Sequence, residues 1–225
     1  MAISVVQTAV SGNLSGTAVF GNPVTPGNTV LMYVSAYGDG APISTSGPQL
    51  GRSSVPGASL LTSDYSTSGG NIYSSLWMLP TISPVNGDGE TLSITADGGG
   101  GLASVIGWEV AGLGSSPSLD MSSAAAAAGG ATTSSGTTGA ITSASEIVVG
   151  GATAYAETQS SPGSPWIVSD TPNAWCWAGY QIVSSAGGSY TWTQTTGGAQ
   201  DADWAAVVAT VKATYSPQLL ISGII

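Results

Sequence analysis

Apolar and small polar residues alternate along almost the whole chain, and clusters of Gly, Pro, Asn and Asp separate the alternating runs. A period of two is typical of β-strands, and such clusters are typical of the turns between strands. The pattern predicts strands at residues 3–10, 15–20, 28–37, 71–80, 90–96, 102–112, 145–156, 174–184, 189–196 and 203–214, with shorter strands near 48–52 and 60–66. We therefore expect an all-β fold, an antiparallel two-sheet β-sandwich that is jelly-roll-like, with about 10–13 strands and little or no helix.

Individual segments indicate their places in the sheets. Residues 28–37 are apolar on both faces, which predicts a central strand. Residues 90–95 alternate more cleanly, so one face of that strand should meet solvent. The residues Ala-Gly-Gly at 186–188 adopt the backbone conformations that tight turns need, and they predict a hairpin that pairs 178–184 with 189–196.

The alanine run from Ala124 to Ala128 departs from the strand pattern. Alanine has a high helix propensity, but five residues are too few to hold a helix alone, and Gly, Ser and Thr follow as far as Gly139. We expect residues 122–139 to form a long surface loop with at most one helical turn. A tract so poor in large side chains is expected either to be mobile or to lie against a neighbouring subunit.

Residues 1–215 are expected to form a single β-sandwich domain, because no change in composition divides them. The C-terminal segment 216–225 differs, since Pro217 interrupts the preceding strand and large aliphatic side chains follow. This segment is either a last strand of the same sheet or an arm that docks on another subunit. In the second case the partner-binding residues are Leu219, Leu220, Ile221, Ile224 and Ile225.

Charge narrows the range of partners. The chain has 2 Lys and Arg residues against 12 Asp and Glu residues, for a formal net charge of -10. Without a basic patch to neutralise phosphates, nucleic acid is not an expected partner. No apolar run approaches the roughly 18 residues of a membrane span, and the first residues lack the pattern of a signal peptide. We therefore expect no membrane association and synthesis in the cytoplasm. The single Cys176 is expected to be a buried thiol.

Side chains for catalysis are scarce, since the chain contains no histidine. A serine nucleophile could use only Lys212 as its amine base, and an outward position on a strand accounts for that lysine. A glycosidase needs two carboxylates, for which Glu109, Glu146 and Glu157 are the candidates. Trp108 beside Glu109 suggests a sugar platform with an acid, but adjacent residues of a strand point to opposite faces. We predict that the protein is not an enzyme, with no catalytic residue and no cofactor.

Two pairs of carboxylates stand two residues apart: Asp88 with Glu90, and Asp201 with Asp203. Oxygen ligands of this kind suit Ca²⁺, but neither pair fits the twelve-residue EF-hand loop. Two carboxylates in a turn more often only keep the turn solvated. These four residues are the weak candidates for a metal site.

Four tryptophans near the C-terminal third form a candidate surface for a glycan or a protein: Trp166, Trp175, Trp177 and Trp192. Aromatic rings stack on the CH faces of sugars. The alternative is that these rings form one end of the sandwich core, and this alternative is favoured because large rings are usually buried.

Several blocks of the sequence together suggest a family. They are residues 28–37, 72–79, 91–112, 119–120, 146–151 and 188–213. In these blocks the chain resembles virion proteins of tailed bacteriophages and their prophage relatives, and the likeness covers most of the chain. The resemblance implies a jelly-roll or related β-sandwich that serves as a capsid decoration, minor tail or fibre module. It transfers no catalytic residue.

The resemblance implies a non-enzymatic structural protein of the virion, made in the host cytoplasm. We expect a capsid decoration (cement) protein, a homotrimer that binds the major capsid protein or other virion subunits. Many weak copies around symmetry axes would stabilise the shell by avidity. Two alternatives stay open: a minor tail or fibre protein, and a carbohydrate-binding module that uses the Trp and Tyr side chains. A glycan binder should expose tryptophan, whereas a decoration protein should bury its apolar segment at a subunit contact.

Overall fold

The structure is a computed structural model that describes residues 2–11, 16–38, 49–50, 59–66, 71–79, 93–95, 102–155, 160–169, 175–196 and 203–214. Within these residues the regular structure consists of strands alone. No helix of the described chain could cross a lipid bilayer. The expectation of an all-β fold is therefore confirmed.

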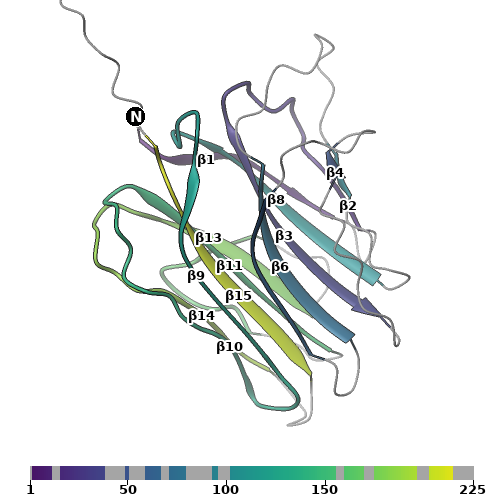
Figure 1. The fold of residues 1–225 in the computed structure, drawn as a ribbon. Helices are drawn as coiled ribbons and strands as arrows, with labels where there is room; N and C mark the ends of the chain where they lie inside the picture. The colour runs from purple at the N-terminus through teal and green to yellow at the C-terminus, as the bar shows by residue number, and fades with distance from the viewer. Residues whose placement is uncertain are drawn as a thin grey trace, which may run out of the picture.

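Ten strands form two five-stranded antiparallel sheets that pack face to face as a β-sandwich (Figure 1). The first sheet has the order β1 (Ser4–Val10), β8 (Leu102–Ala111), β3 (Thr29–Gly38), β6 (Asn71–Leu79) and β5 (Ser59–Ser66). The second sheet has the order β12 (Ile167–Ser169), β13 (Cys176–Val183), β11 (Glu146–Ala154), β15 (Trp204–Lys212) and β9 (Ser118–Ala127).

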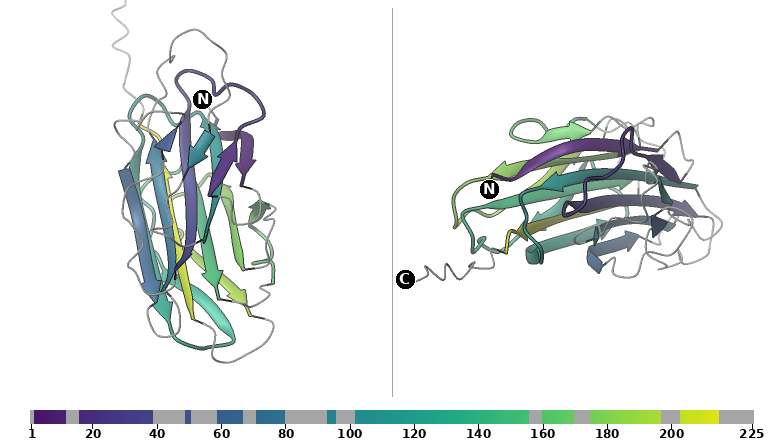
Figure 2. Two further views of the ribbon diagram at one scale, coloured as in Figure 1. Left: turned by 90° about the vertical axis from the view of Figure 1, so that its right-hand side faces the viewer. Right: turned by 90° about the horizontal axis from the view of Figure 1, so that it is seen from above.

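The remaining described strands form two small sheets. One has the order β2 (Thr17–Val19), β7 (Ser93–Thr95) and β4 (Gln49–Leu50). The other pairs β10 (Thr132–Thr137) with β14 (Thr191–Thr195). Each covers the outer face of one main sheet: Phe20, after β2, packs on the first sheet, and Trp192 of β14 packs on the second. Figure 2 shows the resulting layers from the side and from above.

The main core lies between the two large sheets, where aliphatic and aromatic side chains from both inner faces meet. Tyr33 of β3 is fully buried at its centre. Its hydroxyl lies 3.0 Å from Ser74 Oγ in the first sheet and 2.7 Å from Thr153 Oγ1 in the second. This small polar network therefore links the two sheets within an otherwise apolar interior.

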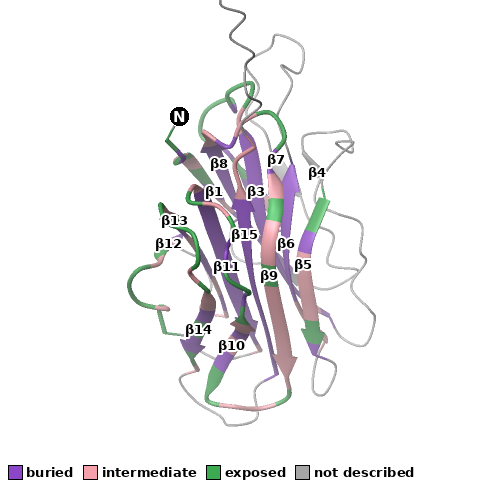
Figure 3. Ribbon diagram, turned by 60° about the vertical axis from the view of Figure 1, so that its left-hand side comes forward, coloured by how far each residue is buried: buried purple, intermediate pink, exposed green. Residues whose placement is uncertain are grey.

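The two edges of the sandwich differ. At one edge β5 of the first sheet lies beside β9 of the second, as Figure 3 shows. At the opposite edge are β1 and the short β12, which contact each other much less than β5 contacts β9. Ile167 of β12 and Ile182 of β13 face the sandwich interior here, yet they remain 53% and 45% exposed. We call the second edge the open edge.

The strand predictions agree closely with the structure. All twelve predicted segments contain a described strand. The segment predicted at 28–37 corresponds to β3, the central strand of the first sheet, in which every residue except Tyr37 is buried. Cys176 is a buried thiol, as expected. The side chains of residues 90–95 and the C-terminal segment 216–225 lie outside the described residues.

The expected surface loop at residues 122–139 is wrong. These residues form most of β9 and all of β10, joined by a turn in which Gly129 and Gly130 have positive φ. Strand β15 needs a partner on the side away from β11, and alanine side chains are small enough to pack on both faces of that partner. Ala124 touches the main core, and Ala125 touches the outer cluster around Trp192. Tertiary pairing overrides helix propensity here.

The expected hairpin between residues 178–184 and 189–196 is also wrong. Strand β13 pairs with β11 and β12, whereas β14 leaves the sheet and pairs with β10. The turn residues instead bond to the segment before β11: Gly187 donates its N–H to the carbonyl of Ile141 at 3.0 Å. The physical reason is Trp192, because burying its indole on the outer face of the second sheet requires β14 to lie in another layer.

Candidate functional site

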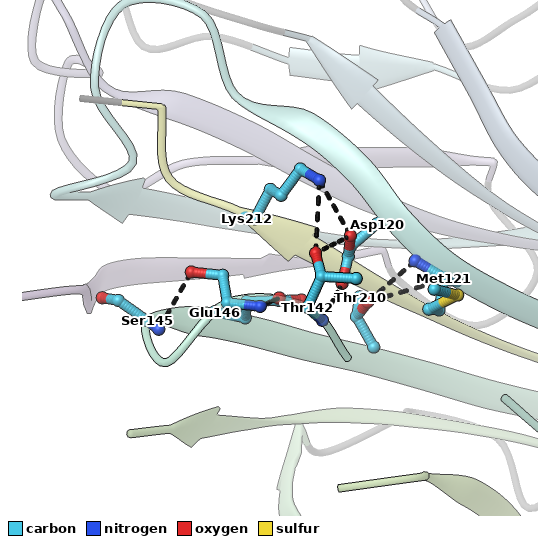
Figure 4. A network of polar contacts seen from close by, with 8 residues as sticks. Asp120, Met121, Thr142, Ser145, Glu146, Thr210 and Lys212 are labelled. Atoms are coloured by element: carbon cyan, nitrogen blue, oxygen red, sulfur yellow. Dashed lines mark hydrogen bonds and ion pairs between the residues drawn. The ribbon is translucent and has the colours of Figure 1, made fainter. Parts of the chain in front are cut away.

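A polar cluster lies where three neighbouring strands of the second sheet reach the same end of the sandwich (Figure 4). Asp120 comes from β9, Glu146 from β11 and Lys212 from β15, and Glu146 is the register partner of Lys212. Lys212 Nζ lies 2.8 Å from Asp120 Oδ1. Thr142, just before β11, donates both its N–H and its Oγ1–H to Asp120, each at 2.6 Å.

The hydrogen bonds within this cluster determine its charges. Burial by itself raises the pKa of Asp120, but the donors on Lys212 and Thr142 outweigh it and hold that pKa well below its usual range. The bond to Asp120 raises the pKa of Lys212. Lys212 is therefore a charged ammonium bound to a carboxylate, and not the neutral amine that a serine nucleophile would need.

Glu146 is in a different state from its two neighbours. It is fully buried; its Oε1 accepts the N–H of Ser143 at 2.9 Å, and its Oε2 has no hydrogen-bond partner. Burial raises the pKa of this carboxyl group. The donors on Ser143 and Thr210 lower the pKa in part, and the adjacent Asp120 raises it again, so the net shift is upward. The cluster thus contains one anchored ion pair and one carboxyl group without a cation of its own.

Glu109 lies on the outer face of the first sheet and is held by neutral donors. Its carboxylate accepts Gln7 Nε2–H at 2.6 Å, the N–H of Thr25 at 2.9 Å and Asn28 Nδ2–H at 2.5 Å. Burial raises its pKa, but these donors together bring the pKa below the usual value. A carboxylate saturated with donors is an anchor for the segment around Thr25 rather than a proton donor.

The two described glutamates cannot act as a glycosidase pair. Trp108 points into the core between the sheets, so its neighbour Glu109 faces the outer side of the first sheet, as expected from strand geometry. Glu146 lies on the outer face of the second sheet, on the other side of the sandwich. Glu157 lies outside the described residues.

The candidate metal ligands are only partly placed. Asp88, Glu90 and Asp201 lie outside the described residues. Asp203 is buried just before β15, and its carbonyl accepts the N–H of Tyr155. Within the described ranges no three acidic or cysteine side chains come together as a metal site.

The four candidate tryptophans do not form one surface. Trp192 is fully buried, its Nε1–H bonds to Gln194 Oε1 at 2.8 Å, and Trp166 packs edge-on against it at 4.7 Å. The half-buried Trp177 packs against the same outer cluster. These rings pack into the apolar cluster of the outer layer. The predicted glycan surface is therefore wrong for Trp192, and the alternative that this ring is buried in a core is correct.

Trp175 lies elsewhere, in an aromatic group that the sequence did not indicate. Its ring meets Tyr155 edge-on at 6.1 Å, and Tyr155 stacks on Tyr37 with centroids 4.6 Å apart. All three side chains are half-buried. Tyr37 and Tyr155 are far apart in the sequence, and only the pairing of the sheets brings them together. Asp120 and Thr142 are likewise separated in the sequence and are brought together by the fold. For Lys212 the sequence did carry a signal, because a single lysine among many acidic residues is expected to have an acidic partner.

The proposed partner-binding residues Leu219, Leu220, Ile221, Ile224 and Ile225 lie outside the described residues. The described chain ends at Thr214, whose N–H donates to the carbonyl of Leu113 at 3.1 Å. This point is at the same end of the sandwich as Ile182, because Val211 pairs with Ile147 and Ile147 pairs with Ile182. Comparisons of the chain with known protein families, with curated proteins and with solved structures found no match in any of the three.

Proposed function

We propose that the protein is a non-enzymatic structural subunit of a tailed-phage virion, a capsid decoration protein that works as a homotrimer in many copies. The observation that carries the proposal is the open edge. Ile167 and Ile182 lie next to Tyr180 on one face, and these three residues form what we call the open-edge patch. These apolar side chains are partly exposed to water in a free subunit, and a contact with another subunit would bury them at a gain in free energy.

The position of the C-terminal segment supports a contact between copies. Val211, three residues before Thr214, lies two strand spacings from Ile182, about 10 Å. The segment 216–225 carries five large aliphatic side chains, and ten extended residues reach about 33 Å. Such a segment can add to an unpaired strand edge of a neighbour and cover apolar side chains there. The open-edge patch and the segment therefore make a self-complementary pair of surfaces.

The other proposed features fit this role. An acidic surface with a formal net charge of -10 keeps free subunits apart until specific contacts form. A sandwich whose two outer faces are covered by further strands is a rigid body, so little flexibility is lost on docking. Weak contacts to the major capsid protein gain strength from repetition around symmetry axes.

Light scattering tests the self-association. We expect the full chain to be a trimer, and a chain that ends at Tyr215 to be a monomer. Replacing Ile167 and Ile182 with serine should have the same effect, whereas Leu60→Ser, a 46% exposed leucine on the opposite edge, should leave the mass unchanged. A full chain that is a monomer at all concentrations would count against the proposal.

The virion part needs particles. In a phage that encodes this chain, particles assembled without it should release their DNA at a lower temperature than complete particles, and added protein should restore the difference. Equal release temperatures, with the protein absent from purified complete particles, would exclude a decoration role.

The aromatic group of Tyr37, Tyr155 and Trp175 favours a second candidate, glycan binding by a tail or fibre module. Stacked, half-buried rings at the end of a rigid sandwich are the chemistry that recognises sugar CH faces. A glycan screen read by tryptophan fluorescence tests it, with Trp175→Ala as the variant that should lose binding and Trp166→Phe as a control remote from this group.

A further inference from the structure

The buried carboxyl group of Glu146 poses a problem if it is charged. The residue has no solvent exposure, and Oε2 has no hydrogen-bond partner. A buried carboxylate oxygen without a donor is strongly destabilising, whereas a protonated oxygen needs only an acceptor. Asp120 and Thr210 are the side chains that interact with this carboxyl group, and Figure 4 shows both in the same cluster.

Every titratable group that faces Glu146 from the described elements can be named. Asp120 comes from β9, Lys212 from β15, and Tyr190 precedes β14 in the outer layer. Lys212 is already bound to Asp120 at 2.8 Å. Tyr190 is neutral below its raised pKa and brings no positive charge. One ammonium therefore serves two carboxyl groups.

We propose that Glu146 and Asp120 share a proton, and that Asp120, Glu146 and Lys212 form a pH-sensitive clamp on the edge strand β9. In the closed state Glu146 Oε2–H donates to the Asp120 carboxylate, and the three side chains sum to zero charge. When Glu146 ionises, its proton passes to water and the group carries one buried negative charge. Two carboxylates then repel each other at the point where β9 is held.

The strand β9 is the element that this repulsion should loosen. Asp120 ties it to Thr142 and Lys212, and the next residue, Met121, donates its N–H to Thr210 Oγ1 at 3.0 Å. These contacts coincide with the irregularity in the β9–β15 ladder between Ala209 and Val211, where regular pairing is interrupted. Side-chain contacts therefore carry more of the attachment here than in a regular ladder.

Carbon-detected NMR tests the protonation state directly. The chain contains four glutamates, so labelling the glutamate carboxyl carbons gives four resonances, and Glu146→Gln identifies one of them. We expect the Glu146 resonance to titrate clearly above the usual glutamate range of about 4.3. Titration at or below that value overturns the proposal.

The variant Asp120→Asn tests the sharing. Removing the negative neighbour should move the Glu146 titration to lower pH, because the ionised form then meets no like charge. An unchanged titration means that burial alone raises the pKa and that no proton is shared, which overturns the clamp. Asp64→Asn, which removes a carboxylate from β5 in the opposite sheet, is the matched control and should leave the Glu146 titration in place.

Hydrogen exchange tests the consequence for β9. Glu146→Gln keeps an acceptor for Ser143 and places an N–H toward Asp120, so it imitates the protonated state at every pH. Above the Glu146 pKa, amides 118–121 should exchange at least about threefold faster in the unchanged chain than in Glu146→Gln at the same pH, and equally fast below it. Equal rates at all pH values overturn the clamp even if Glu146 is protonated.

Discussion

Replacing Gly151 with alanine tests how closely the two main sheets approach each other. Gly151 lies in the middle of β11, and a Cβ atom added there would stand 2.5, 2.7 and 2.9 Å from three atoms of the Tyr33 ring. Ordinary contacts between carbon atoms are about 3.5–4.0 Å. The ring or the strand would therefore have to move by about 1 Å.

The size of the effect follows from what holds Tyr33. Overpacking a core costs about 1–3 kcal/mol, and Tyr33 has no free space because it is fully buried. Moving the ring also disturbs the hydroxyl bonds to Ser74 and Thr153, and a buried polar group left unpaired costs about 1–3 kcal/mol. Alanine recovers about 0.5–1 kcal/mol of chain entropy relative to glycine. We expect a net loss of about 2–4 kcal/mol in the free energy of unfolding.

Guanidinium unfolding followed by tryptophan fluorescence measures this loss, and calorimetry should show a fall in Tm of about 2–4 °C for each kcal/mol. The matched control is Gly21→Ala, where an added Cβ meets no atom within 4 Å and stability should change by less than about 0.5 kcal/mol. In a chain that already carries Tyr33→Leu, Gly151→Ala should lower the free energy of unfolding by less than it does in the unchanged chain. If Gly151→Ala is as stable as the unchanged chain, the argument from close approach is refuted.

Three further outcomes follow from single contacts. Donors hold the Glu109 pKa below its usual value, so the stability that this carboxylate contributes is present above the unfolded-state pKa and is lost as pH falls through the folded-state pKa. Glu109→Gln should cost about 1.5–3 kcal/mol at neutral pH. In urea unfolding measured over a series of pH values, the variant should also lose less stability toward acid pH than the unchanged chain. Gly179→Ala places a Cβ 2.6 Å from the carbonyl of Ile167 and should speed amide exchange in β12 while β11 and β15 stay protected. The buried Cys176, with its raised pKa, should react with a thiol reagent at least about a thousandfold slower in the native than in the unfolded chain, by absorbance; comparable rates would contradict its burial.

The strands that the sequence predicts well are those whose own side chains alternate or are apolar on both faces. In residues 28–37 and 203–214, burial on both faces produces a continuous apolar run, which is visible without any knowledge of neighbours. The short β12 was missed because its three residues carry too little pattern. The partner of each strand was harder to predict than the strand itself, as the wrong hairpin at 178–196 illustrates, because partner choice depends on where Trp192 is buried.

The candidate site was less predictable for the same reason. Each member is an ordinary residue in its own segment, and the chemistry arises from register: β11 places Glu146 opposite Lys212, and β9 brings Asp120 alongside. The sequence interpretation assigned Lys212 to an outward strand position, which accounts for its location but not for its ion pair. A scarcity of basic residues could have indicated that each one has an assigned acidic partner, but it could not have said which of the 12 acids that would be.

The strand that misled the sequence interpretation is also the one on which the polar cluster acts, and both facts have one cause. Because β9 is built largely from alanine and serine, it has neither a strong strand pattern nor much apolar area to bury, and no side chain along it is fully buried. Its attachment therefore relies more on ladder hydrogen bonds to β15 and on the contacts of Asp120 and Met121 at one end than on apolar packing. A change of one charge beside Asp120 is small against the stability of the whole sandwich but large against that of this strand. Loss of the Glu146 proton should therefore release the end of β9 well before it unfolds either sheet.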